Sequence, residues 1–162
     1  MGTTRTASTH WEGSLFEGSG QVSLESSGIG TYDVNWPSRA EQANGKTSPE
    51  ELIAAAHSSC FSMAFSNGLA KAGTPPTTLD TTADVTFVPG TGITEIRLTV
   101  RGAVEGMSEA DFVAAARADL EASEGDAAGA YLRAAPFNQS FLGLERYWRK
   151  RREREADAAA SA

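Results

Sequence analysis

The stretch SPEELIAAAHSSCFSMAF, residues 48–65, decides the fold that this sequence predicts. It opens with the signals of a helix start, because Ser48 is a natural N-cap, a proline follows in the first helical position, and Glu51 completes a capping box. Residues 52–65 then offer almost no polar face, and a helix that is apolar all round is normally buried. We therefore predict a long, buried central helix that ends at Gly73, ahead of two prolines.

Alternation of apolar and polar residues predicts strands on both sides of this helix. Upstream, residues 11–25 indicate a hairpin with its turn at EGSG (17–20), and TYDVNW (31–36) indicates a short strand. Downstream, residues 79–87 and 96–104 indicate an antiparallel hairpin with one buried face, turning at PGTG.

A second helix is predicted to start at Ser108, with SEAD as its capping sequence. Its inner side would carry Phe112, Val113, Ala116 and Leu120. The order of elements is then two or three strands, a helix, two strands and a helix. This order predicts an α+β fold.

Length and composition restrict the class of protein. The 162 residues suffice for one domain with a hydrophobic core, and the net charge of −7 argues against a nucleic-acid or anionic-membrane binder. A single cysteine excludes an internal disulfide and a cysteine-rich zinc site. His10, His57 and Cys60 are too scattered to predict a metal site, so no metal or cofactor is expected. No leader or membrane-spanning run is recognisable, and we expect a soluble, cytoplasmic protein.

The character of the sequence changes near residue 120. Residues 121–130 are small and acidic, whereas six of the chain's 14 basic residues fall within residues 146–154. We therefore divide the chain into a domain at 1–120 and an atypical C-terminal segment at 121–162. The basic run is most simply a solvated helix end, and a nucleic-acid contact is the weaker alternative.

Cys60 is the only cysteine, and the residues alone leave its role open. A free cysteine on a buried helix usually behaves as a small apolar side chain. It is a nucleophile where a nearby positive charge favours the thiolate, since an ordinary thiol with a pKa of about 8.5 is only slightly ionised near neutrality. The structural thiol and the nucleophile lead to different functions.

Four stretches together resemble the OsmC family, and the likeness extends over about residues 8–118. They are HWEG (10–13), GSGQVSLES (18–26), TSPEELIAAAHSSCFSMAF (47–65) and LDTTADVTF (79–87). OsmC-type proteins and the related organic hydroperoxide resistance proteins are bacterial thiol peroxidases of oxidative and osmotic stress defence. The resemblance implies an intertwined homodimer, with antiparallel sheets wrapped around the long central helix, that reduces organic hydroperoxides.

The resemblance also assigns roles to particular residues. Cys60, in the block Ala-Ala-His-x-x-Cys, would be the nucleophile, Arg39 would activate it, and Glu50 would hold the arginine through a carboxylate–guanidinium pair. His57 suits a packing role better than that of a base. Apolar neighbours would favour an organic peroxide, and those expected are Phe61, Met63, Phe65 and Trp36.

Helix geometry then bears on how the site is assembled. Glu50 and Cys60 would lie about 15 Å apart along one straight helix, so they cannot meet along that path within one chain. We expect a second copy of the chain to complete the site, with Cys60 near the dimer interface.

The sequence departs from the family pattern at one place. The family's second cysteine, which resolves the oxidised first one, is replaced by Leu120 if Ser123 aligns with the serine of its motif. We therefore expect a one-cysteine cycle, in which a sulfenic acid on Cys60 is reduced by an external thiol, such as the dihydrolipoyl group of a lipoylated protein. The alternative is a catalytically impaired member that binds an apolar ligand or senses peroxide through Cys60.

Overall fold

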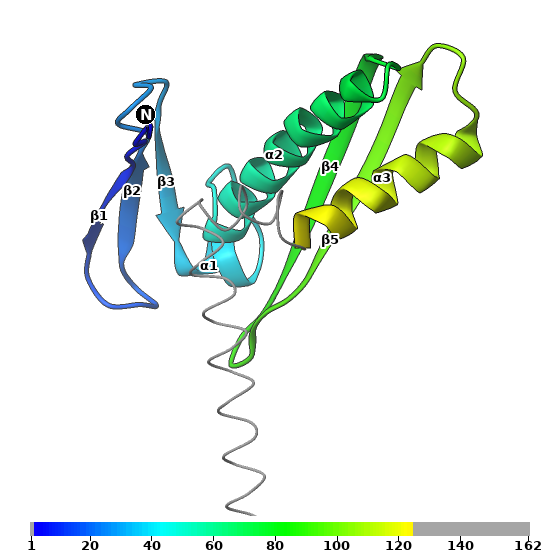
Figure 1. Ribbon diagram of the computed structural model, residues 1–162. Helices are drawn as coiled ribbons and strands as arrows, with labels where there is room; N and C mark the ends of the chain where they lie inside the picture. The colour runs from blue at the N-terminus through cyan, green and yellow to red at the C-terminus, as the bar shows by residue number, and fades with distance from the viewer. Residues whose placement is uncertain (1, 125–162) are drawn as a thin grey trace, which may run out of the picture. The chain divides into compact units, whose positions relative to one another are not determined.

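The computed structural model describes residues 2–124, with side chains to residue 120, as an α+β chain (Figure 1). The predicted segment 121–162, with its basic stretch, lies outside these residues except for the last turn of the final helix. The elements are β1 (Ser8–Glu12), β2 (Ser19–Ser23), β3 (Thr31–Asn35), α1 (Trp36–Ala40), α2 (Pro49–Lys71), β4 (Pro76–Val88), β5 (Gly92–Val104) and α3 (Glu109–Glu124). They form two compact units, residues 2–63 with 77–103, and residues 64–76 with 104–124.

The first unit begins with an antiparallel sheet in the order β1-β2-β3. The predicted hairpin is present, but its turn is not at residues 17–20: β2 already begins at Ser19, and the connection spans residues 13–18. Gly20 is a strand residue that pairs with Trp11, and a Cβ on it would lie 2.9 Å from the indole ring. This glycine therefore makes room for a tryptophan and does not form a turn.

A short helix, α1, follows β3 and carries Arg39, and we predicted no helix at these residues. Asn35 caps it by accepting a hydrogen bond from the Ser38 backbone N–H at 2.8 Å, and Ser38 Oγ lies 3.3 Å from the Asn35 backbone N–H. Ser38 Oγ also donates to the carbonyl of Thr47 at 2.9 Å, and the Thr47 N–H donates to Asp33 at 3.1 Å. These bonds hold α1 and β3 beside the start of α2.

The central helix α2 has the predicted bounds. Ser48 Oγ accepts the Glu51 N–H at 3.1 Å, but the Glu51 carboxylate takes the Thr47 hydroxyl at 2.6 Å, so the predicted capping box is only half formed. At the other end, Gly73 adopts a φ of 85°, and its N–H and that of the next residue donate to Ala70 and Leu69 at 3.1 and 3.0 Å. This is a Schellman ending, which favours glycine.

Burial of α2 differs from the prediction. One side of the helix is exposed in the single chain: Ala55, Ala56 and Ser59 are exposed, and the Met63 residue is 61% exposed. The prediction that α2 is covered all round is therefore wrong for one chain taken alone, because the hairpin of its own unit covers a single side. Full burial stays a prediction for an assembly of two chains.

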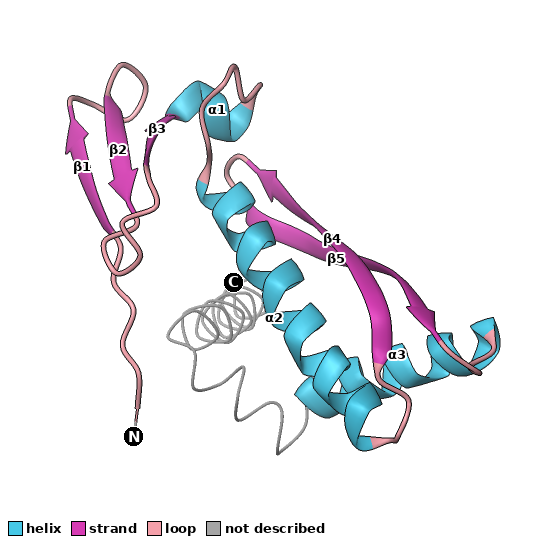
Figure 2. Ribbon diagram, turned by 90° about the horizontal axis from the view of Figure 1, so that it is seen from above, coloured by secondary structure: helices cyan, strands magenta, loops and turns pink. Residues whose placement is uncertain are grey.

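The strands β4 and β5 form the predicted hairpin, and in both views they run along the first part of α2 (Figures 1 and 2). Alternate residues of β4 are half-buried and exposed, as the pattern of polar and apolar residues predicts. Ser62 Oγ donates to Thr81 Oγ1 at 2.7 Å and fastens the helix to β4.

The second unit packs the end of α2 against α3. Phe65 is only 1% exposed and meets the Phe112 ring edge-on at 5.3 Å between centroids. Leu69, four positions later on α2, is also buried. The Ser108 cap of α3 is confirmed, since Ser108 Oγ accepts the Asp111 N–H at 3.2 Å. Two residues of the predicted inner side, Val113 and Leu120, are exposed in the single chain, because a helix packed on one neighbour buries only one stripe.

Candidate functional site

Arg39 and Glu50 form the ion pair that the sequence predicts. The Arg39 Nε–H donates to both Glu50 carboxylate oxygens at 3.1 and 3.2 Å, and Nη2 donates to Oε1 at 2.9 Å. The Glu50 side chain is only 8% exposed, whereas that of Arg39 is 32% exposed. A carboxylate buried to this degree needs a partner, so the pair fixes both side chains at the start of α2.

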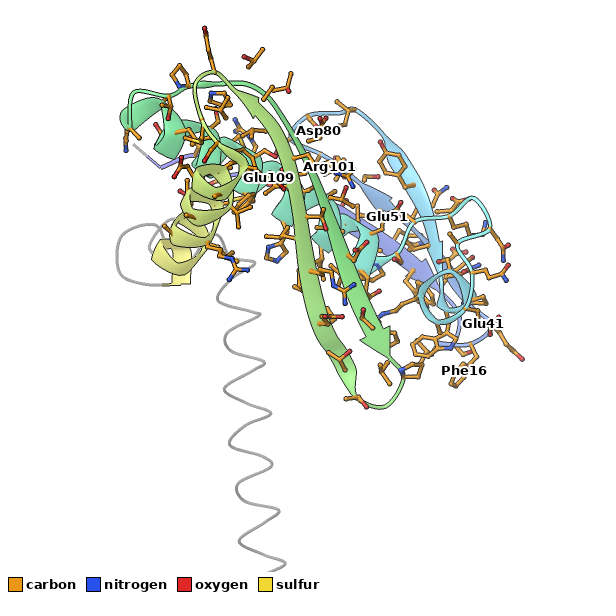
Figure 3. All side chains as sticks on the ribbon, turned by 90° about the vertical axis from the view of Figure 1, so that its right-hand side faces the viewer. Phe16, Glu41, Glu51, Asp80, Arg101 and Glu109 are labelled. Atoms are coloured by element: carbon orange, nitrogen blue, oxygen red, sulfur yellow. The ribbon has the colours of Figure 1, made fainter. Side chains whose placement is uncertain are left out.

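An aromatic residue that sequence reasoning missed lies against the same guanidinium. The Arg39 guanidinium carbon is 4.1 Å from the centroid of the Phe87 ring, near the end of β4. Trp36, the first residue of α1, meets that ring edge-on at 6.1 Å between centroids. Phe16, which is labelled in Figure 3, meets the Trp36 ring at 5.6 Å. The strand alternation placed Phe87 on a buried face, but nothing in the sequence shows which cation it meets.

An open pocket of about 390 Å³ lies beside the ion pair. Its wall combines charged groups with small apolar side chains and the Phe87 ring. The lining residues are Arg39, Ala43, Lys46, Ser48, Glu50, Glu51, Ala54, Ala83, Asp84, Val85 and Phe87. The pocket can therefore hold a molecule that is partly apolar and has an oxygen-rich end.

Cys60 is not brought to this pocket. It is half-buried on α2, ten positions after Glu50, which is about 15 Å along an α-helix. Burial raises the pKa of the Cys60 thiol in the single chain. The structure thus joins two of the three predicted catalytic residues and leaves the third at a distance, so its role stays a prediction.

The predicted neighbours of Cys60 are only partly available to a ligand. Phe65 is buried against Phe112, so the single chain does not present it to a peroxide, contrary to the prediction. Met63 is exposed on α2 and Phe61 is half-buried. His57 is half-buried, and burial lowers the pKa of its imidazole.

Among residues 2–124, no three His, Cys, Asp or Glu side chains gather as a metal site would require. No helix within the same residues has the length and apolarity needed to cross a bilayer.

Sequence comparison identifies the protein family of this chain. The sequence model of the family described as OsmC-like protein matches residues 42–122. The chain belongs to this family. It is 45% identical over 106 residues to the protein named peroxiredoxin OsmC of Escherichia coli strain K12, covering 64% of this chain and 73% of that protein. The same figures apply to the protein of that name from Shigella flexneri.

A solved structure agrees with the assignment to the OsmC-like family. The crystal structure of an organic hydroperoxide resistance protein OsmC from Legionella pneumophila matches with a TM-score of 0.56, covering 87% of this chain and 90% of that one at 20% identity. At this identity the likeness concerns the fold. It confirms the predicted α+β OsmC-like fold class for this chain.

Proposed function

We propose that this protein is a thiol peroxidase that reduces organic hydroperoxides to alcohols, with Cys60 as nucleophile, Arg39 as its activator and Glu50 as the partner of the arginine. The observation that carries this proposal is the fixed Arg39–Glu50 pair at the edge of a partly apolar pocket. Membership of a family whose relatives are named peroxiredoxin OsmC supports the same chemistry.

The reaction is a two-electron transfer between sulfur and oxygen. The Cys60 thiolate attacks the terminal oxygen of the hydroperoxide, an S–O bond forms, and the O–O bond breaks. The terminal OH passes to sulfur as a sulfenic acid, and the departing alkoxide takes a proton to become an alcohol. Arg39 favours the thiolate and stabilises negative charge on the departing oxygen.

A second copy of the chain supplies the arginine that Cys60 needs. Burial alone raises the Cys60 pKa, which opposes attack, so the thiol needs a cation that its own chain holds near Glu50. In a homodimer, Arg39 and Glu50 of one chain would serve Cys60 of the other. The exposed side of α2 around Met63 supports such an interface.

Turnover then depends on an external thiol, because Cys60 is the only cysteine of the chain. A first thiol attacks the sulfenic sulfur and releases water, leaving a mixed disulfide. A second thiol displaces Cys60 and leaves with the first as a disulfide, so a dithiol completes the cycle alone. Dihydrolipoyl groups on a lipoylated protein are dithiols of this kind.

Peroxide consumption tests the proposed function. Purified protein is mixed with cumene hydroperoxide, with dithiothreitol or reduced lipoamide as donor, and peroxide loss is followed. We expect many equivalents consumed per chain, none with Cys60→Ser, and a sulfenic acid on Cys60 by mass spectrometry when the donor is omitted. Peroxide loss that is unchanged in Cys60→Ser would contradict the proposal.

A second candidate function is an impaired member that senses peroxide or binds an apolar ligand. Two observations favour it: the raised pKa of the half-buried Cys60, and leucine at position 120 where a second cysteine is expected. The same assay separates the candidates. A sensor consumes one equivalent per chain and stops, and a binding protein consumes none.

A further inference from the structure

We propose that Phe87 is a positioning residue for Arg39, which holds the face of the guanidinium while Glu50 holds its edge. This inference rests on the proposed function in one respect only, namely that the arginine so positioned acts on a peroxide. Phe87 ends the stretch LDTTADVTF, which carries part of the family resemblance, but the resemblance assigns it no role, and it lies 37 positions after Glu50 on another element.

The guanidinium of Arg39 makes two different kinds of contact. Glu50 binds the edge formed by Nε and Nη2, at distances of 2.9–3.2 Å. The central carbon of the guanidinium lies over the Phe87 ring, 4.1 Å from its centroid, well inside the range over which a cation is attracted to an aromatic face. The two-point ion pair still permits the guanidinium to tilt about the line through its contacts with Glu50, and the ring restricts that tilt.

Phe87 is itself held in place from the helix that carries the arginine. Trp36 and Arg39 are three positions apart on α1, so they lie on one side of the helix. Both contact Phe87: the indole ring is edge-on with its centroid 6.1 Å away, and the guanidinium carbon lies 4.1 Å over the ring. The Phe87 ring on β4 therefore contacts both α1 and its arginine and helps to fix the position of the guanidinium.

The consequence is that the remaining N–H groups of Arg39 are held in place as hydrogen-bond donors for a ligand. Within residues 2–124, both N–H groups of Arg39 Nη1 and one of Nη2 donate no hydrogen bond to the protein. Arg39 and Phe87 both line the pocket, together with Ala83 and Val85. Phe87 thus aims the donors at the oxygens of a bound hydroperoxide and offers apolar surface to its organic group.

Three variants test this inference. Phe87→Leu keeps apolar bulk but removes the ring, and Phe87→Tyr keeps the ring. Phe16→Leu is the matched control, because Phe16 contacts Trp36 but neither contacts Arg39 nor lines the pocket. Circular dichroism and thermal melting verify that each variant folds.

The first measurement does not depend on activity. Protons above an aromatic face are shielded, so the Arg39 side-chain signals, assigned with Arg39→Lys, should lie upfield in the NMR spectrum. We expect the shift to be lost in Phe87→Leu and kept in Phe87→Tyr and Phe16→Leu. An Arg39 signal that is unchanged in Phe87→Leu would overturn the inference whether or not the protein reduces peroxides.

The second measurement is the rate of Cys60 oxidation by cumene hydroperoxide in a single turnover. We expect Phe87→Leu to slow it about fivefold or more, and Phe87→Tyr to restore it. In the Arg39→Lys background, Phe87→Leu should have no further effect, because its action passes through the guanidinium. An equal slowing in both backgrounds would overturn the positioning role. Absence of any reaction in the unmodified protein would defeat the proposed function, while the NMR result would still decide the contact.

Discussion

At the scale of the residue, the decisive feature is that one buried carboxylate fixes the position of one arginine side chain. Glu50 is buried at the start of α2, and its charge is satisfied by Arg39 across three contacts. The sequence predicts both residues only through the family motif, since a glutamate in a first helical turn and an arginine in a polar segment are common surface residues. The aromatic face under Arg39 could not be predicted, because it depends on which strand residue meets α1.

Replacing Glu50 should therefore affect stability and activity together. Glu50→Gln leaves Arg39 without its charge partner, so we expect the free energy of unfolding to fall by about 1–3 kcal/mol. Peroxide reduction should fall about 100-fold, because a mispositioned catalytic group costs about that factor. Urea unfolding and initial rates measure the two effects. Glu109→Gln, an exposed acidic residue in the first turn of α3, serves as control and should change neither by much.

The half-buried His57 predicts a pH dependence of stability. Burial lowers the pKa of its imidazole below the ordinary value of about 6.5. The unfolded chain then binds the proton more tightly, so the free energy of unfolding should fall as pH drops from above 6.5 through the folded-state pKa. Urea unfolding between pH 7.5 and about pH 5 measures this slope. His57→Gln should flatten it, and a slope unchanged by that substitution would contradict the assignment.

At the scale of the element, local signals located the long elements and missed the short one. The Ser48 cap and the Gly73 ending predicted α2, and strand alternation predicted β4 and β5. The five-residue helix α1 was not predicted, because its stability depends on contacts with other segments of the chain. Besides the adjacent Asn35 cap, it contacts Thr47 and Phe87. Such tertiary contacts leave no periodic pattern to detect.

The contact between α2 and α3 gives a prediction at this scale. Gly68 lies opposite Asp119, and a Cβ on Gly68 would stand 3.0 Å from the Asp119 carboxylate. Alanine in place of glycine within a helix stabilises by about 1 kcal/mol when nothing interferes. We expect Gly68→Ala to gain that amount only in an Asp119→Ala background, and less in the natural one. Equal gains in urea unfolding would show that the carboxylate moves aside freely.

At the scale of the whole molecule, the single chain is sparsely buried. Within residues 2–120, Val22, Phe65 and Leu69 are the only buried large apolar residues, whereas others such as Phe16, Ile29 and Met63 are exposed. A domain of this size normally buries more, and a second copy would cover such surface. The fold class could be predicted from the sequence. The assembly of the site from two chains was expected from helix geometry and stays a prediction, because one chain carries no pattern that identifies the surface a second copy would cover.

Subunit complementation tests the central claim most directly, namely that Arg39 of one chain serves Cys60 of the other. Chains carrying Arg39→Gln and chains carrying Cys60→Ser, with different affinity tags, are produced together and the mixed dimers are isolated. Each variant alone should be inactive towards cumene hydroperoxide. We expect the mixed dimer to regain about half the activity of the unmodified dimer, since one of its two sites has both residues intact. A mixed dimer as inactive as its parents would contradict the account.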